Sequence, residues 1–192
     1  MVVVGLCILV FLAMMVFGQE NVIGPLLISE YIRPALPEIR DGEFWRLLTP
    51  ALIHFGLFHI VFNMLWTWEL GRLIEWRQGP VMIGFTILLT AAVSNVAQYV
   101  VSGPLFGGMS GVVYGLFGYV WIQGLTNPGF GVSMNPAVVK LLLAWFVICW
   151  TGLLETFFGI AVANTAHSAG LVTGILLSAG ISGFYRLSAR RA

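Results

Sequence analysis

Long hydrophobic runs alternate along the chain with short polar stretches. No Lys, Arg, Asp or Glu occurs between Arg77 and Lys140, or between Glu155 and Arg186. A helix needs about 20 mostly apolar residues to cross a bilayer, and an open strand edge leaves backbone groups unsatisfied in lipid. The pattern therefore predicts an all-α polytopic membrane protein, with six transmembrane helices in a single domain over residues 1–192. The predicted spans are residues 2–17, 50–70, 81–101, 109–124, 137–154 and 160–184.

Composition supports a membrane protein and argues against a water-soluble domain. Hydrophobic residues make up 59% of the chain and charged residues 9%, with a mean hydropathy of +0.95, whereas soluble domains carry about 25% charged residues. The net charge of +1 shows no basic face for a nucleic-acid partner. Cys7 and Cys149 lie in apolar segments and are predicted to be small buried hydrophobes, not a disulfide. Residues 1–20 lack a basic start and a clear cleavage site, which favours a first span over a signal peptide.

The distribution of basic residues predicts the orientation. Residues 19–49 form a long first link with charged, aromatic and proline residues, predicted to lie partly in the membrane surface. In a six-span chain one side carries Arg72, Arg77, Lys140, Arg186, Arg190 and Arg191, and the other carries Arg33, Arg40 and Arg46. The positive-inside rule then places both termini in the cytoplasm.

Polar side chains inside the spans are candidates for function, because they are costly in lipid. They are His54, His59, Asn63, Ser110, Tyr114, Asn164 and His167. Counted from the predicted span ends at about 1.5 Å per residue, His59, Ser110 and His167 lie roughly 10–14 Å below the same membrane face. The orientation above makes this the outer face.

Glycines predict how two of these spans meet. Gly111 and Gly115 form a small-xxx-small pair on the fourth span, and Gly170 and Gly174 share a face with His167 on the sixth. Small residues let transmembrane helices approach closely. Contact between the two glycine faces is expected to bring His167 next to the helix that starts at Ser110.

A serine beside a histidine at one depth predicts nucleophilic catalysis. The hydroxyl of Ser110 needs a base to take its proton, and His167 is the candidate. No carboxylate lies at this depth, and Glu155 reaches it only if its loop folds back, so a Ser–His dyad is predicted in place of a triad. The backbone N–H of Ser110 and the side chains of His59 and Asn63 are the expected oxyanion donors.

Four motifs resemble the rhomboid family of intramembrane serine proteases, and in particular the bacterial GlpG type in its minimal six-span form. They are Trp45-Arg46, HxxxN at His59–Asn63, GMSG at Gly108–Gly111, and AHSAG at Ala166–Gly170 continuing to Gly174. GxSG alone is a weak signal. The four together, in order on spans two, four and six, are specific.

The resemblance implies a six-helix rhomboid bundle in the bacterial inner membrane, with an active site open toward the periplasm. Ser110 would be the nucleophile, His167 the base, and Tyr114 would stack on the His167 ring. Arg46 would be an internal anchor of the first link. Span five and residues 150–158 would form a lateral gate, against which Phe62 and Trp66 could pack. Family substrates are single-span membrane proteins cut near the outer face, and no cofactor is implied.

The sequence leaves three alternatives to a protease site, namely a metal site, an inactive client-binding protein, and a transporter or channel. His54 and His59 suggest a metal site, but their spacing of five puts them on different faces of one helix and no further ligand lies at their depth. A catalytically inactive rhomboid-like protein that binds client transmembrane helices is expected to lack Ser110 or His167. A small transporter or channel is expected to show charged residues along a path, or an internal repeat.

Overall fold

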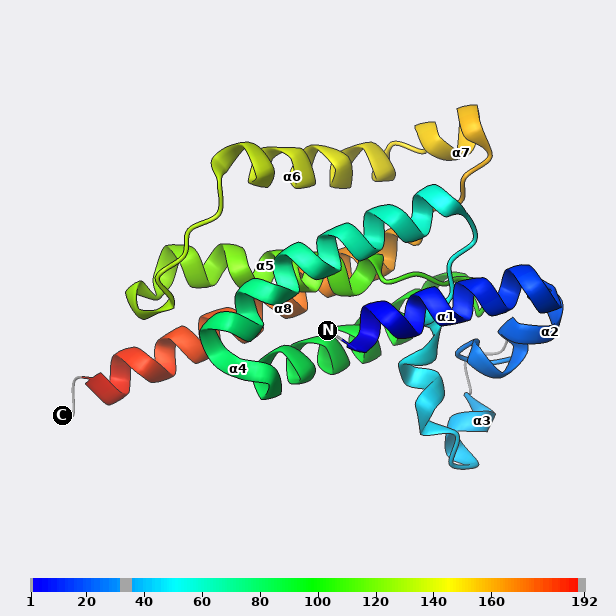
Figure 1. Ribbon diagram of the computed structural model, residues 1–192, viewed down its shortest axis with the longest axis horizontal. Coiled ribbons are helices and arrows are strands. Elements are labelled where there is room, and N and C mark those ends of the chain that lie inside the picture. Colours follow the sequence, from blue (N-terminus) through cyan, green and yellow to red (C-terminus); the bar gives the residue numbers. More distant parts are fainter. Residues whose placement is uncertain (1, 32–35, 190–192) are drawn as a thin grey trace.

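The computed structural model describes residues 2–31 and 36–189, with side chains up to residue 183. Every secondary-structure element in these ranges is helical (Figure 1). Three basic residues used to predict the orientation, Arg33, Arg190 and Arg191, lie outside the described residues, and the side chain of Arg186 does too. The proline at position 34, within the first link, also lies outside them.

Five long helices build the bundle: α1 (Val2–Phe17), α4 (Leu57–Ser102), α5 (Ser110–Thr126), α6 (Pro136–Trp150) and α8 (Asn164–Ala189). Short elements lie in the connections: α2 (Gln19–Ile23), η1 (Gly24–Leu26), α3 (Pro37–Arg40), η2 (Phe44–Leu47), η3 (Thr49–Leu52), η4 (Pro128–Phe130) and α7 (Leu153–Phe158). Helix α4 bends at Gly79, whose φ of 85° is non-helical, with Pro80 directly after it. The bend divides α4 into two apolar halves, so the described residues hold six apolar helical segments.

The six segments overlap the predicted spans, but several predicted boundaries are wrong. The second span was predicted to end at residue 70, whereas its helix continues to the bend at Gly79, and the fifth was predicted to end at residue 154, whereas α6 ends at Trp150. Two predicted starts differ most from those of the site-bearing helices. The second span was predicted from residue 50, whereas its helix begins at Leu57, because Pro50 lies in η3 and Gly56 is extended. The sixth was predicted from residue 160, whereas α8 begins at Asn164, because Gly159 ends α7 in the left-handed conformation. Both true starts lie closer to the histidines of their helices than predicted.

Two helices are long and apolar enough to cross a membrane by length and composition, namely α4 with 46 residues and the segment Asn164–Gly183 with 20. Helices α1 and α6 are apolar but shorter, with 16 and 15 residues. Large hydrophobic side chains point outward, including Val81 at 83% and Phe58 at 79% exposure. Hydrophobic surface on this scale marks contact with something other than water, which indicates a membrane protein. The number of six crossings stays a prediction.

Helix α5 is the centre of the molecule. It packs mainly against α8 and α4, and its residues from Gly111 to Val120 are all buried. Helix α6 runs along the outside of this core with fewer neighbours (Figure 1). The site-bearing helices α4, α5 and α8 therefore form a fixed unit, and α6 is the least constrained long helix beside them.

The first link is held by the buried guanidinium of Arg46. It donates hydrogen bonds to the carbonyl oxygens of Gly24 at 2.9 Å and Leu27 at 3.0 Å, and it pairs with the carboxylates of Glu43 and Glu30. These bonds bring η1 and η2 together. The role of Arg46 as an internal anchor was implied by the resemblance, and the geometry supports it.

Candidate active site

Ser110 and His167 lie side by side at the beginnings of two helices. Ser110 is the first residue of α5, and His167 lies in the first turn of α8. The distance between the Ser110 hydroxyl oxygen and His167 Nε2 is 2.8 Å, and His167 is only 5% exposed. The pairing predicted from depth and helix faces is present as a hydrogen bond.

Two glycine contacts bring α5 and α8 close enough for this bond. A Cβ on Gly170 would overlap the carbonyl oxygen of Gly111, and a Cβ on Gly174 would overlap that of Gly115. The predicted contact between the glycine faces is therefore present. A third contact, between Gly118 and the Leu171 carbonyl, was not predicted. The sequence signal for this contact is Gly118 itself, which continues the face of Gly111 and Gly115 by one further turn of α5.

A row of polar residues on α4 packs on the other side of the site and was also missed. Thr90 lies against Gly115 and Ser94 against Gly111. Each hydroxyl bonds back to α4, with Thr90 donating to Thr86 at 2.7 Å and Ser94 to Ala91 at 3.2 Å. Their polar atoms are therefore satisfied within the helix. The spacing of four residues was a usable signal for one polar helix face.

Gln98 continues this row and supports α8 directly. Its Oε1 accepts a hydrogen bond from the backbone N–H of Ala166 at 3.0 Å. The first N–H groups of a helix have no partner within the helix, so Gln98 supplies one from α4. This contact fixes the turn of α8 that carries His167, and nothing local in the sequence around His167 indicates it.

The loop before Ser110 is anchored by His54, which is fully buried. His54 Nε2 lies 3.4 Å from the backbone nitrogen of Met109, and its Nδ1 lies 3.1 Å from the Leu52 carbonyl oxygen. The prediction that His54 and His59 lie on different faces of one helix is wrong, because His54 precedes α4. Their ring centroids are 5.0 Å apart. Within the described part of the chain, no three His, Cys, Asp or Glu side chains gather as metal ligands.

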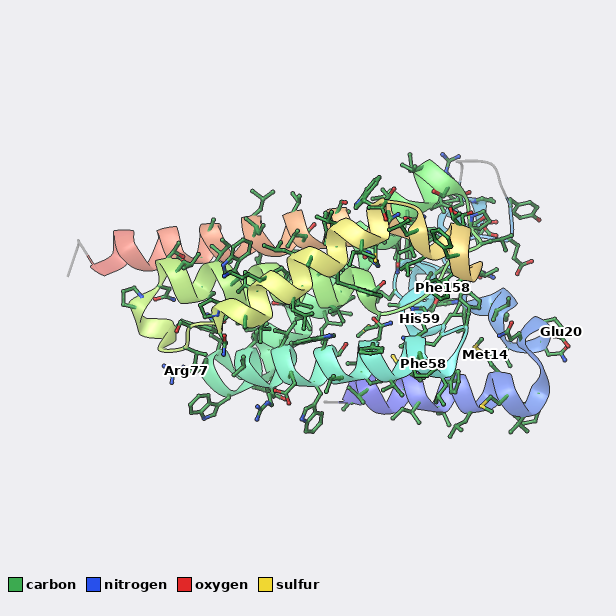
Figure 2. All side chains as sticks on the ribbon, turned by 90° about the horizontal axis from the view of Figure 1, so that it is seen from above. Met14, Glu20, Phe58, His59, Arg77 and Phe158 are labelled. Carbon is green, nitrogen blue, oxygen red and sulfur yellow. The ribbon has the colours of Figure 1, made fainter. Side chains whose placement is uncertain are left out.

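His59 and Asn63 occupy the first turns of α4. Gly108 adopts a φ of 125°, and a Cβ on it would lie 2.6 Å from His59 Nε2, so the His59 ring faces the backbone two residues before Ser110. The side-chain nitrogen of Asn63 donates to the His59 carbonyl at 2.8 Å. An amide nitrogen carries two hydrogens, so one N–H of Asn63 remains for another acceptor. Figure 2 shows His59 far from Arg77, at the opposite end of the helical bundle.

These motifs fall inside one region that matches a known family. The Rhomboid domain family matches residues 41–184 of the 192-residue chain. The chain belongs to the rhomboid family. Rhomboid proteins are generally intramembrane serine proteases, and the matched region contains Ser110, His167, His59 and Asn63.

In this rhomboid protein Tyr114 packs against His167. The Tyr114 and His167 ring centroids are 4.9 Å apart with the planes tilted by 41°, so the rings touch at an angle and are not parallel as a stack would be. The Tyr114 hydroxyl donates to the Leu142 carbonyl of α6 at 3.2 Å, and the Phe146 ring lies 5.3 Å from the Tyr114 ring. Tyr114 therefore lies between His167 and α6.

No carboxylate orients His167 among the described residues. His167 Nδ1 is buried and has no hydrogen-bond partner there, and Glu155 is exposed on α7. Among the described residues the site is thus a serine–histidine pair with an aromatic ring against the histidine. That this pair acts as a catalytic dyad stays a prediction. Of the two residues expected against the gate, Phe62 is exposed and Trp66 packs on the hydrophobic core.

Proposed function

We propose that this rhomboid protein is an intramembrane serine endopeptidase, which hydrolyses peptide bonds in or near transmembrane segments of single-span membrane proteins. The hydrogen bond of 2.8 Å between Ser110 and His167 carries the proposal. A serine hydroxyl bonded to a buried histidine, as Ser110 is to His167, is the arrangement that activates a hydroxyl as a nucleophile. It uses no metal and no cofactor.

The bond suggests a two-step acyl transfer. His167 Nε2 takes the proton of the Ser110 hydroxyl as its oxygen attacks the substrate carbonyl carbon. The tetrahedral intermediate then releases the amine, which receives the proton from His167, and an acyl ester remains on Ser110. Water, deprotonated by His167, hydrolyses the ester and restores both residues.

The negative oxygen of the intermediate needs donors. The first N–H groups of α5, including that of Ser110, have no partner within their helix, and no side chain caps this end. The His59 ring lies against Gly108, and Asn63 follows His59 one turn later on the same face of α4. We assign the oxyanion hole to these three groups, and the orientation of the base to Tyr114.

The helix directions support the proposed setting in the membrane. Helices α4, α5 and α8 all begin at the end that holds the site, whereas Arg77 bonds the Gly129 carbonyl beyond the far end of α5. Arg77 therefore lies at the end away from Ser110. With that end in the cytoplasm, both termini are cytoplasmic and the site opens toward the periplasmic side of a bacterial inner membrane. Six crossings follow if both halves of α4 span the bilayer, and α6 with α7 is the proposed gate for substrate entry.

Cleavage of a single-span test substrate in detergent checks the proposal. Wild type is expected to cut, and Ser110→Ala and His167→Ala are expected to lose activity by at least about 10³-fold, because the nucleophile or its base is gone. Ser168→Ala is the matched control, since among the described residues its hydroxyl bonds the Asn164 carbonyl of its own helix and no group of the proposed dyad. Retained cutting by Ser110→Ala would remove Ser110 as the nucleophile. Binding of the substrate without cleavage by any variant would favour the client-binding alternative.

A further inference from the structure

Asn164 lies one helical turn before His167 and is held in a defined orientation. Its side-chain nitrogen donates to the Cys149 carbonyl of α6 at 3.0 Å. A carbonyl accepts only from the nitrogen side of an amide, so this bond turns the other end of the amide, Oδ1, away from Cys149. Oδ1 is buried and has no hydrogen-bond partner in the described part of the chain.

His167 presents the complementary group. When its Nε2 accepts the proton of Ser110, the neutral ring must carry its own proton on Nδ1. Nδ1 is buried and unpartnered among the described residues. A buried donor and a buried acceptor therefore lie on the same turn, at positions i and i+3, where Cβ atoms are about 5–6 Å apart.

We infer that Asn164 is a positioning residue for His167. Its Oδ1 accepts a hydrogen bond from Nδ1–H, directly or through one water molecule, and so stabilises the tautomer whose Nε2 is free to take the Ser110 proton. The inference rests on the proposed protease function. Cys–His–Asn proteases use an asparagine in this way, and here the amide works together with the Tyr114 ring.

The Cys149 bond links this role to α6. The Tyr114 hydroxyl also bonds a carbonyl of α6, that of Leu142. Both groups that we assign to the orientation of His167 are thus tied to the same helix. A displacement of α6 that breaks these bonds is expected to loosen the base.

Three variants distinguish the role of Asn164 Oδ1 as the acceptor for His167 from the role of the Asn164 amide nitrogen as an anchor to Cys149. Asn164→Ala removes both the Oδ1 acceptor and the Cys149 bond, Asn164→Asp keeps an acceptor and loses the donor, and Ser168→Ala removes a neighbouring hydrogen bond on the same helix. We expect kcat to fall about tenfold in Asn164→Ala with KM within twofold, Asn164→Asp to recover most of this loss, and Ser168→Ala to match wild type. Equal losses in Asn164→Ala and Asn164→Asp overturn the inference, and so does an unchanged kcat in Asn164→Ala.

The ¹⁵N spectrum of histidine-labelled protein gives a readout independent of cleavage, with His167 assigned by comparison with His167→Ala. Wild type and Asn164→Asp are expected to show the Nδ1–H tautomer, and Asn164→Ala a mixture with Nε2–H. If Asn164→Ala does not fold, Asn164→Asp decides, since a tautomer mixture in that variant contradicts the inference. Because the spectrum needs no substrate, failure of the protease proposal is distinguishable from failure of this one.

Discussion

Gly170 on α8 packs so closely on Gly111 of α5 that the Gly111 carbonyl oxygen occupies the place where a side chain on Gly170 would begin. The obstructing atom belongs to the backbone of a buried helix, which cannot rotate away as a flexible side chain can. Helices α5 and α8 can therefore approach this closely only because residue 170 has no Cβ atom. The same close approach sets the 2.8 Å distance between Ser110 and His167.

We predict that Gly170→Ala forces α8 away from α5. Overpacking of a core costs about 1–3 kcal/mol, and cleavage activity is expected to fall more than tenfold because the Ser110–His167 bond lengthens. Thermal unfolding in detergent and a cleavage assay measure the two effects. Gly180→Ala, on the same helix, would place its Cβ in open space; it is the control and should change neither. Full activity in Gly170→Ala would show that the helices tolerate a wider gap.

We predict that the ring of Tyr114 matters more for activity than its hydroxyl. Tyr114→Phe keeps the ring against His167 and loses the bond to Leu142, so its kcat is expected to stay within a few fold and its stability to fall by about 1 kcal/mol. Tyr114→Ala removes the ring and should lower kcat more than tenfold. The two variants are compared by steady-state kinetics and thermal unfolding. An equal loss of kcat in both would assign the orienting role to the hydroxyl.

The helical fold and the residues of the site are readable from the sequence for a physical reason. A bilayer permits few polar side chains, so those that remain stand out against the apolar pattern, and glycines on one face indicate where helices touch. Ser110, His167 and the Gly111–Gly170 contact are predictable on these grounds alone. Their roles in catalysis stay predictions until they are measured.

Tertiary contacts explain what the sequence does not predict. His54 was assigned to a helix because its surroundings are apolar, but Pro50 and Gly56 break the helix on either side of it. Gln98 bonds a backbone group 68 residues away, and no local pattern encodes such a partner. Helix starts shift by several residues for the same reason, since loop conformation decides them and hydropathy does not.

We predict that Arg46 stabilises the fold far more than Arg72 does, although both arginines form ion pairs. Arg46 is buried and bonds two carbonyls and two carboxylates. Its removal leaves the Gly24 and Leu27 carbonyls without these donors, at about 1–3 kcal/mol for each group left unsatisfied. Arg72 pairs with Glu69 at the surface, so removal of its side chain should lower the free energy of unfolding by at most about 1 kcal/mol. Thermal unfolding of Arg46→Ala and Arg72→Ala makes the comparison. Similar melting temperatures for the two would show that the Arg46 network does not stabilise the link.

We predict an acid-sensitive contribution from Glu38. Burial acts to raise the pKa of its carboxyl, but hydrogen bonds from the Glu30 N–H and the Ser29 hydroxyl, with the positive charge of Arg46, outweigh this and hold the pKa below its usual range. A group whose pKa is lowered on folding stabilises the protein fully above its unfolded pKa, about 4.3 for Glu. That contribution is lost as the pH falls through the folded value.

The comparison is between wild type and Glu38→Gln, melted at pH 7 and again near pH 3. The excess in melting temperature of wild type over Glu38→Gln is expected to be largest at pH 7 and to shrink in acid. The amide side chain of the variant cannot titrate, so the difference isolates the Glu38 carboxyl from the other acidic groups. A difference that stays constant from pH 7 to pH 3 would contradict the prediction.

We predict that Asn63→Ala slows the chemical step without unfolding the protein. Asn63 uses one N–H on the His59 carbonyl, and the second is the proposed donor to the oxyanion. Loss of one such donor lowers kcat by about 10²–10³-fold, with KM little changed because the charge develops only in the transition state. Thr67→Ala is the matched control, since Thr67 is buried one turn further along α4 and its hydroxyl has no partner among the described residues. A rise in KM with constant kcat in Asn63→Ala would mean that Asn63 binds the substrate in its ground state and does not stabilise the oxyanion.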